Sequence, residues 1–158
     1  MTEFTHFDPA GHAVMVDIGA KEESDRLAVA RGTVLMDKAT LALIRGGGVK
    51  KGDVLSVARL AGIMGAKRTP DLIPLCHPIA LSSVELSFTL EDEPPAIVIE
   101  AKCRVCGRTG VEMEAMTAVA VAALTVYDMC KSADRSMVLA EIRLIHKSGG
   151  RSGAWSAA

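Results

Sequence analysis

Hydrophobic and polar residues alternate along four stretches of the chain, as they do in β-strands that bury one face. The first stretch covers residues 26–36 (RLAVARGTVLM) and the last covers residues 137–147 (MVLAEIRLIHK). The other two, residues 82–91 and 96–106, meet at EDEPP, a sequence typical of a hairpin turn. The pattern therefore predicts four strands, of which the middle two pair with each other.

Two segments between the first strand and the hairpin have helical spacing. Asp37 can cap a short helix over residues 38–44 (KATLALI), which three glycines then stop. Asp53 can cap a second helix over residues 54–67, VLSVARLAGIMGAK, in which apolar residues recur every three or four positions.

A third and longer helix is predicted over residues 109–131, with Thr109 and Glu112 spaced as a capping box. The order of elements is then strand, helices, strand, strand, helix, strand. This order predicts an α+β ferredoxin-like sandwich, an antiparallel sheet with helices packed on one face. Such a sheet leaves its other face bare. We expect an aliphatic bare face to be covered by another subunit, so the protein should be oligomeric.

The 158 residues predict a single domain, with flexible termini at about residues 1–13 and 152–158. The formal net charge of −1 argues against a general nucleic-acid or membrane-surface binder. The polar N-terminus does not resemble a secretory signal. The longest apolar-rich stretch, AMTAVAVAALTVY, is shorter than the ~20 residues that a membrane span needs. We therefore expect a cytoplasmic protein.

Four cysteines raise the question of a metal site. Cys103 and Cys106 form a C-x-x-C, and Cys76 precedes His77. However, the C-x-x-C lies in a predicted strand, where residues three apart point to opposite faces. The spacing therefore favours reduced thiols, with Cys130 in the core, over a zinc site.

Charged residues also suggest chemistry near the end of the long helix. Asp128 and Lys131 share one helical face, and spacing alone favours an exposed ion pair of little energetic weight. The alternative is that Lys131, beside a carboxylate and apolar surface, is a tuned acid or base.

Basic residues gather in three short segments, two of them beside glycines and one at a helix end. They are Lys50-Lys51 after three glycines, Lys67-Arg68 at a helix end, and Lys147 with Arg151 around SGG. These segments can be solvated turns, but glycine also lets backbone N–H groups approach phosphate while cations neutralise it. Together they favour an anionic small ligand.

The segment KRTPDLIPLCHP (residues 67–78) holds His77 in a stiff, proline-bounded loop. Rigid backbone is useful where a reacting group must be aimed, and imidazole titrates near neutral pH. A lone histidine is nevertheless more often structural than catalytic.

Taken together, four segments make the chain resemble the cyclic pyranopterin monophosphate synthases, the molybdenum-cofactor biosynthesis protein C family. They are MVDIGAK, KKGDVLSVARLAGIMGAKRTPDLIPLCHP, TGVEMEAMTAVAVAALTVYDMCK and IHKSGGRSG. They occur in the family's order and spacing, and LIPLCHP with YDMCK is highly specific. This resemblance favours the catalytic alternative for Asp128 and Lys131.

The resemblance implies a homohexamer built from three dimers, with active sites at the dimer interfaces. The implied substrate is (8S)-3',8-cyclo-7,8-dihydroguanosine 5'-triphosphate, and the implied products are cyclic pyranopterin monophosphate and pyrophosphate. Magnesium can accompany the triphosphate. No other cofactor and no metal ligand of the protein is implied.

The family's roles fall on matching positions of this chain. Asp128, Lys131 and Lys51 are the implied catalytic residues, and a lysine working near neutral pH needs its pKa lowered by nearby cations or burial. The remaining residues are implied to bind substrate. Leu75, Cys76, His77 and Asp17 would line the pocket, Glu112, Met113 and Glu114 would face the pterin end, and Lys21, Arg26, Lys67, Arg68 and Lys147 would hold the triphosphate.

Two non-catalytic functions are alternatives. One is a nucleotide-sensing ferredoxin-like binding module, which would have no use for Asp128, Lys131 and Lys51 together. The other is an RNA-binding sheet, which would stack bases on exposed aromatic residues. The predicted strands offer essentially Phe88 alone for that purpose, which argues against RNA.

Overall fold

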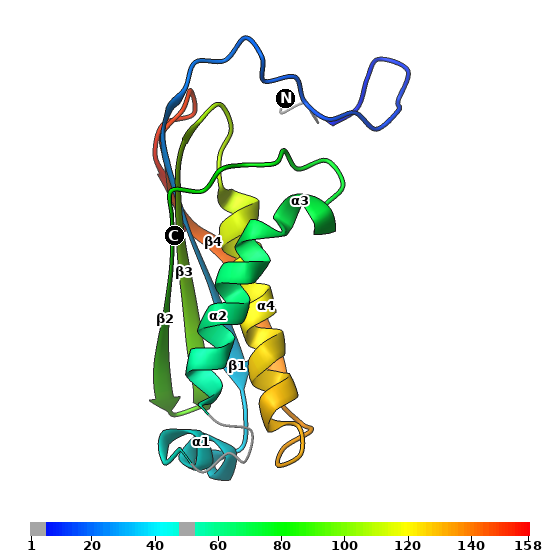
Figure 1. Ribbon diagram of the computed structural model, residues 1–158. Helices are drawn as coiled ribbons and strands as arrows, with labels where there is room; N and C mark the ends of the chain where they lie inside the picture. The colour runs from blue at the N-terminus through cyan, green and yellow to red at the C-terminus, as the bar shows by residue number, and fades with distance from the viewer. Residues whose placement is uncertain (1–5, 48–52) are drawn as a thin grey trace.

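The computed structural model describes residues 6–47 and 53–158, and its centre is an antiparallel sheet of five strands (Figure 1). In spatial order the strands are β2 (Ser83–Asp92), β3 (Pro95–Gly107), β1 (Ser24–Leu35), β4 (Val138–Ser148) and β5 (Trp155–Ser156). The first four have the strand order of a ferredoxin-like sandwich, so the predicted fold class is confirmed. The short fifth strand was not predicted from the sequence.

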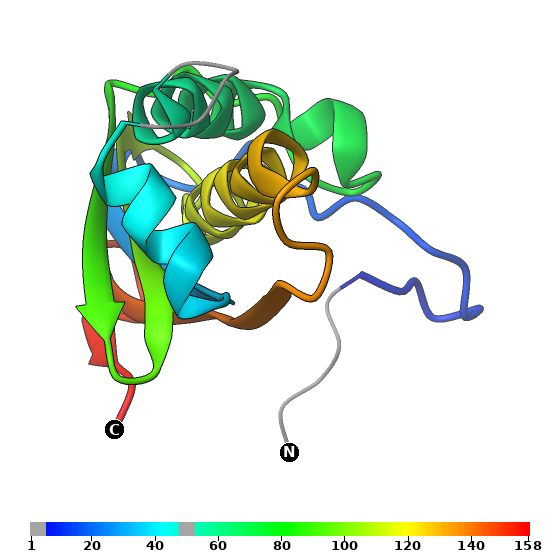
Figure 2. The same cartoon turned by 90° about the horizontal axis from the view of Figure 1, so that it is seen from below.

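Helices cover one face of this sheet. The structure contains α1 (Lys38–Arg45), α2 (Val54–Lys67), α3 (Thr69–Leu72) and α4 (Glu112–Cys130). Figures 1 and 2 show α2 and α4 lying side by side along the sheet. The bounds of α2 agree with those predicted, whereas the single turn α3 falls in the segment expected to be a stiff loop.

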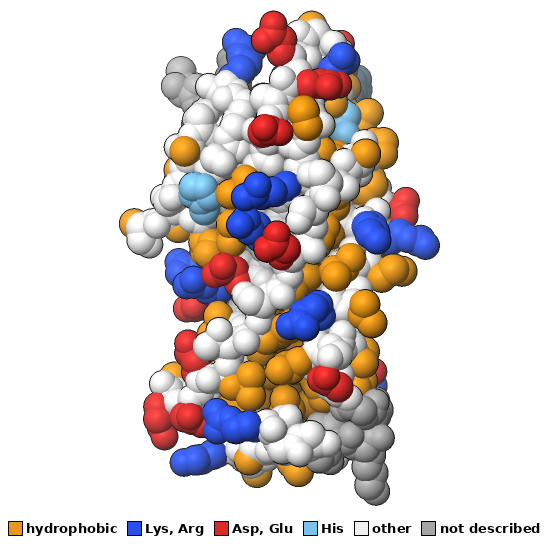
Figure 3. Space-filling view, turned by 60° about the vertical axis from the view of Figure 1, so that its left-hand side comes forward, with side chains coloured by type: hydrophobic (Ala, Val, Ile, Leu, Met, Phe, Trp, Pro, Cys, Tyr) orange, Lys and Arg blue, Asp and Glu red, His pale blue; other side chains and the backbone are white. Residues whose placement is uncertain are grey.

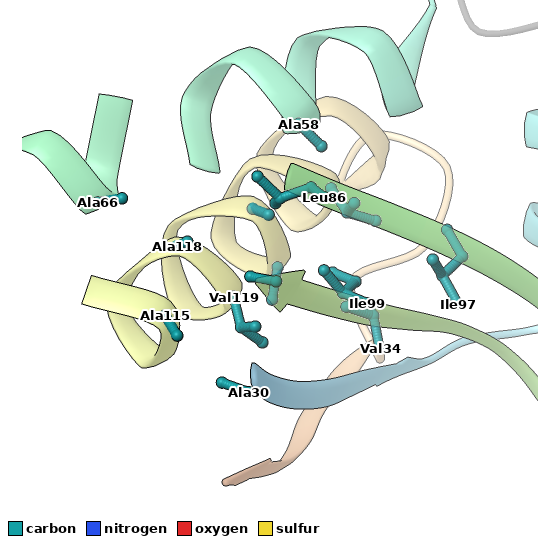
Figure 4. Close-up of a cluster of buried hydrophobic side chains, with 14 of the residues drawn as sticks. Ala30, Val34, Ala58, Ala66, Leu86, Ile97, Ile99, Ala115, Ala118 and Val119 are labelled. Carbon is teal, nitrogen blue, oxygen red and sulfur yellow. The ribbon is translucent and has the colours of Figure 1, made fainter. Parts of the chain in front are cut away.

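The core between sheet and helices is built from small residues (Figure 4). The α4 side chains Ala115, Ala118 and Val119 are fully buried. The close approach of α2 to α4 depends on Gly62, where an added Cβ would lie 3.0 Å from the Ala118 carbonyl oxygen, and on Gly65, where it would lie 2.8 Å from a Val121 methyl carbon. Within the described residues, α4 is the one helix apolar and long enough to cross a membrane, but here it is the central core helix.

The helix N-termini differ partly from the predicted caps. The Asp53 carboxylate accepts hydrogen bonds from the backbone N–H groups of Leu55 and Ser56, which confirms that cap. The predicted capping box of Thr109 and Glu112 is wrong, because α4 begins at Glu112 and no side chain caps it. Glu112 is engaged elsewhere, as described below.

The cap of α1 also departs from expectation. Asp37 occupies the N-cap position, but its side chain makes no capping hydrogen bond. Its backbone N–H instead donates to the Asp134 carboxylate at 2.9 Å. This bond ties the start of α1 to the turn that follows α4, at the lower end of the molecule in Figure 1.

The open face of the sheet is polar, which corrects the expectation of an aliphatic face. Arg31 lies at its centre, pairs with Glu100 at 3.0 Å, and is opposite Arg143 in the register of β1 and β4. Thr33 and Ser87 line a shallow hollow of about 340 Å³ in the same face. Figure 3 shows positive and negative side chains dispersed over another side of the molecule, with hydrophobic side chains gathered between them toward its lower part. A polar face of this kind does not by itself require a second subunit to cover it.

Candidate active site

A cavity of about 280 Å³ opens beside the first turn of α4, at the end of the molecule that the N-terminal segment crosses (Figure 1). Seven of the predicted substrate-binding residues line it, one of which is Lys21 from the N-terminal segment; the other six come from two further segments. They are Leu75, Cys76, His77, Glu112, Met113 and Glu114. The loop 73–82 and α4, which are far apart in sequence, therefore supply one pocket. The structure brings together the predicted pterin-end residues.

Residues 16–21 form one side of this cavity and are held there by two contacts. The His77 Nε2 atom lies 2.8 Å from the Val16 carbonyl oxygen, so this nitrogen carries a proton and donates it. The Arg108 guanidinium donates to the Gly19 carbonyl oxygen at 3.2 Å. Asp17 lies between the lining residues Val16 and Ile18, and its carboxylate accepts from the Gly19 N–H at 2.8 Å rather than lining the cavity.

Two carboxyl groups of the cavity have different environments. Glu112 accepts a hydrogen bond from the Lys147 ammonium at 2.9 Å, and both side chains are about 30% exposed. Glu114 is 3% exposed. Burial, with a smaller contribution from the charge of Glu112, raises the pKa of Glu114 to about 7, against the lowering effect of its own backbone N–H. Lys147, expected on the triphosphate, thus pairs with a carboxylate in this chain.

Arg26 stands at the same end of the sheet. Its Nε donates to the Gly107 carbonyl oxygen at 2.8 Å. The turn formed by Gly149 and Gly150 packs against it with φ angles of 94° and 72°, where a side chain at Gly150 would collide with the guanidinium. Glycine is needed there both for the left-handed backbone and for the close approach.

The cations at the end of α2 lie outside the cavity. Lys67 is the last residue of α2, and Arg68 follows as its C-cap. The Arg68 guanidinium is exposed and lies 3.6 Å from the Asp71 carboxylate, an arrangement that leaves it accessible to an anion. Neither residue lines the 280 Å³ cavity.

Asp128 and Lys131 form the expected pair, with 2.7 Å between carboxylate and ammonium. Both side chains are more than half exposed. The hydrogen bond and charge of Asp128 raise the pKa of Lys131, against a small opposing effect of desolvation. In this chain alone the shift is thus opposite to the lowering expected beside Lys51, which stays a prediction. A lysine that works near neutrality would need a further cation beside it in the assembled site. Lys51, the expected source of that cation, lies outside the described residues.

The predicted site residues therefore separate into two groups at opposite ends of α4. Glu112 and Asp128 are sixteen positions apart on this helix, or roughly 24 Å along its axis at 1.5 Å per residue. Figure 1 shows α4 running from its upper to its lower end, so the cavity beside its first turn and the Asp128–Lys131 pair at its last turn are far apart. One bound nucleotide does not span that distance within a single chain.

Comparison with known sequences identifies the family of this chain. Residues 15–150 match the MoaC family. The chain belongs to the MoaC family. A relative from Rhodospirillum rubrum, described as a cyclic pyranopterin monophosphate synthase, is 64% identical over 153 residues, which cover 97% of this chain and 92% of that protein. The family expected from the sequence is confirmed.

The cysteines of this MoaC-family chain are all free thiols. Cys103 is buried and Cys106 is exposed, so the two face opposite sides of β3 as predicted. Burial raises the pKa of Cys103 to about 12, with a contribution from the charge of Glu114. In the part of the chain that the structure describes, no three His, Cys, Asp or Glu side chains are grouped to hold a metal ion.

Phe88 is unavailable for stacking on the open face of the sheet. It packs partly against the core, and the Arg59 guanidinium of α2 lies over its ring at 5.5 Å from the centroid. The aromatic side chain therefore faces the helices of this MoaC-family fold. A base could not stack on it from the open side.

Several lining residues were missed by the sequence analysis. They are His6, Val16, Ile18, Ile79, Thr109 and Gly110. Thr109 and Gly110 lie three and two residues before the start of α4, and a helix N-terminus is a signal that could have marked them as pocket residues. Apolar residues such as Ile79 carry no comparable signal, because the same residue type fills the core.

Proposed function

We propose that this protein is a cytoplasmic lyase, a cyclic pyranopterin monophosphate synthase of molybdenum cofactor biosynthesis. It converts (8S)-3',8-cyclo-7,8-dihydroguanosine 5'-triphosphate to cyclic pyranopterin monophosphate and pyrophosphate. The observation that carries this proposal is the 64% identity to a synthase of that name over nearly the whole chain. The cavity that Leu75, His77 and Glu114 line supports it, because residues that the family resemblance assigns to the pocket lining and to the pterin end lie together there.

The active site is proposed to combine two copies of the chain. The cavity and the Asp128–Lys131 pair lie too far apart in one chain to serve one substrate. In the proposed arrangement the C-terminal end of α4 of a second copy lies at the cavity of the first. A symmetric dimer would then hold two equivalent sites. We propose that three such dimers form a homohexamer.

Each group has a proposed task. The cavity holds the ring while Lys21, Arg26, Lys67 and Arg68 attract the triphosphate. Forming the cyclic phosphate joins a hydroxyl of the sugar to the α-phosphorus, and the bond from that phosphorus to the leaving pyrophosphate breaks. Fixed cations stabilise the charge that develops on the pyrophosphate. Asp128, Lys131 and Lys51 transfer the protons that ring opening and closure require. Any Mg²⁺ would be bound by the polyphosphate.

A nucleotide-sensing module of the same fold is the alternative function. It would need the cavity and the cations but not the exposed Asp128–Lys131 pair. Turnover distinguishes the two, because a sensor binds the nucleotide without releasing pyrophosphate.

The test supplies the cyclic triphosphate and measures pyrophosphate release by the wild-type protein, by Lys131→Ala, and by Lys38→Ala, an exposed lysine at the start of α1. We expect turnover by wild type and Lys38→Ala and near-complete loss with Lys131→Ala, all three being folded. No pyrophosphate from the wild type would contradict the synthase function. Equal rates for wild type and Lys131→Ala would remove Lys131 from the mechanism.

A further inference from the structure

The carboxyl group of Glu114 is buried beside the cavity and forms no ion pair with a cation of the described residues. Its residue is 3% exposed, yet it lines the cavity and so faces the space that a ligand would fill. Within the described residues no lysine, arginine or histidine forms an ion pair with it, although Lys147 pairs with Glu112 two positions earlier. A buried carboxylate left in this state is costly, and the usual outcome is that it keeps a proton.

Every element around the cavity supplies a titratable or charged neighbour. They are His6 and Lys21 from the N-terminal segment, Cys76 and His77 from the loop 73–82, Cys103 from β3, Glu112 from α4, and Lys147 from β4 through its bond to Glu112. Burial raises the pKa of Cys76 and of Cys103, and the Glu114 charge adds to both shifts. The Glu114 carboxyl group therefore interacts electrostatically with the thiols of Cys76 and Cys103. Neither thiol carries a positive charge that would stabilise the ionised carboxylate.

A bound ligand could supply the hydrogen-bond donors that would stabilise an ionised Glu114 carboxylate. The 2-amino-oxo edge of a guanine or pterin presents two adjacent N–H donors. An ionised carboxylate only accepts hydrogen bonds and can take both of them, whereas a protonated carboxyl must donate with one oxygen and meets a donor there. Such an edge therefore binds the ionised form far better than the neutral one.

We propose that Glu114 holds a proton while the cavity is empty and releases that proton to solvent when a ring with a 2-amino-oxo edge binds. This inference rests on the proposed function. It adds that ligand binding is coupled to proton release and that the cavity discriminates between two kinds of ring. The cavity accepts the ring with two donors and rejects a ring that lacks the 2-amino group. Lys147 assists by pairing with Glu112, which leaves Glu114 as the carboxyl group that changes state.

The linkage makes affinity depend on pH in a defined direction. Burial raises the pKa of Glu114 to about 7 in the empty cavity. Below that pH the protein must lose a proton in order to bind, so affinity rises by up to about tenfold for each unit of increasing pH. Above it the group is already ionised and this dependence disappears.

GTP and ITP are suitable probes, because they share the triphosphate and differ in the 2-amino group. Titration calorimetry at pH 6.5 in two buffers of different ionisation heat gives the number of protons released on binding. The proteins are wild type, Glu114→Gln, and Glu23→Gln as a control from the neighbouring hollow. Ionisation of the triphosphate contributes equally in every protein, so the difference between proteins isolates Glu114.

We expect wild type and Glu23→Gln to release up to about one proton more than Glu114→Gln when GTP binds, and to release fewer with ITP than with GTP. Glu114→Gln should bind GTP more weakly, with a flatter pH dependence. If that variant does not fold, the GTP–ITP difference in the wild type is the test. Equal proton release in wild type and Glu114→Gln, or equal release with both nucleotides in the wild type, overturns the inference.

Failure of this inference and failure of the proposed function are distinguishable. Pyrophosphate release without Glu114-dependent proton release would remove the linkage alone. Absence of GTP binding to the wild-type protein together with absence of turnover would remove both.

Discussion

Glu112 begins α4 and pairs with Lys147, while Asp128 lies sixteen positions later and pairs with Lys131 at 2.7 Å. One rigid helix thus carries a residue of the cavity at one end and the proposed proton-transfer pair at the other. The buried face of α4 is closely packed with alanine and valine side chains, so the helix cannot bend to bring its two ends together.

Complementation between inactive variants tests whether two chains share a site. Lys131→Ala and Glu114→Ala should each be nearly inactive alone. In a 1:1 mixed assembly, half of the dimers are mixed and each has one intact site of two, so about a quarter of wild-type activity should return. Co-expression followed by a pyrophosphate assay measures this. Activity no higher than that of the separate variants would place both residues in one chain's site.

Substitution of Arg68 should mainly weaken substrate binding. Its guanidinium is exposed, and its 3.6 Å contact with Asp71 adds little to folding. Loss of a charge-assisted phosphate contact in Arg68→Ala should raise KM roughly tenfold or more with a small effect on kcat. Arg45→Ala, which removes an exposed pair with Asp92, is the matched control and should change neither constant. A large fall in kcat at saturating substrate would contradict a binding role.

Glu114 should make the folded protein less stable as pH rises. The folded state keeps this proton up to pH 7, whereas the unfolded chain loses it near 4.5, so the folded state binds more protons in between. The free energy of unfolding should therefore fall by up to about 3 kcal/mol between pH 4.5 and pH 7, relative to Glu114→Gln. Urea titrations of both proteins across that range measure the difference. A difference that grows with pH in favour of wild type would have the wrong sign.

Gly62 should not tolerate even a methyl group. An added Cβ would collide with Leu86 and lie 3.0 Å from the Ala118 carbonyl oxygen, which cannot rotate away. Overpacking costs about 1–3 kcal/mol, and in Gly62→Ala this should outweigh the ~1 kcal/mol by which alanine normally favours a helix. Thermal unfolding should show a lower Tm. Gly107→Ala, whose Cβ meets Val105 at an ordinary 3.5 Å, should have a much smaller effect.

The sequence predicted the elements with strong local signals. Alternation located β1 to β4, and the Asp53 cap with helical spacing located α2. The capping box at Thr109 failed because Glu112 has a better partner in Lys147, thirty-five positions away, and a local rule cannot anticipate a long-range ion pair. The polar open face was missed because alternation was used only to locate strands. The same alternation also determines which side chains point to each face of the sheet.

The candidate site was predictable only in part. The resemblance named the residues, and the structure gathers Leu75 to His77 with Glu112 to Glu114 around one cavity. The contact of His77 with the Val16 carbonyl oxygen could not be read from the chain, because it joins segments sixty-one positions apart through a backbone atom. In this chain alone the Asp128 carboxylate raises the pKa of Lys131, whereas the lowering expected beside Lys51 stays a prediction because Lys51 lies outside the described residues.

The small strand β5 has a practical consequence. Trp155 is the chain's single tryptophan, and it sits directly across from Lys147, the partner of Glu112. Tryptophan fluorescence of the unlabelled protein therefore reports on one known place, the pairing of β5 with β4 beside Lys147. Emission changes during a nucleotide titration would register rearrangement there without any introduced dye.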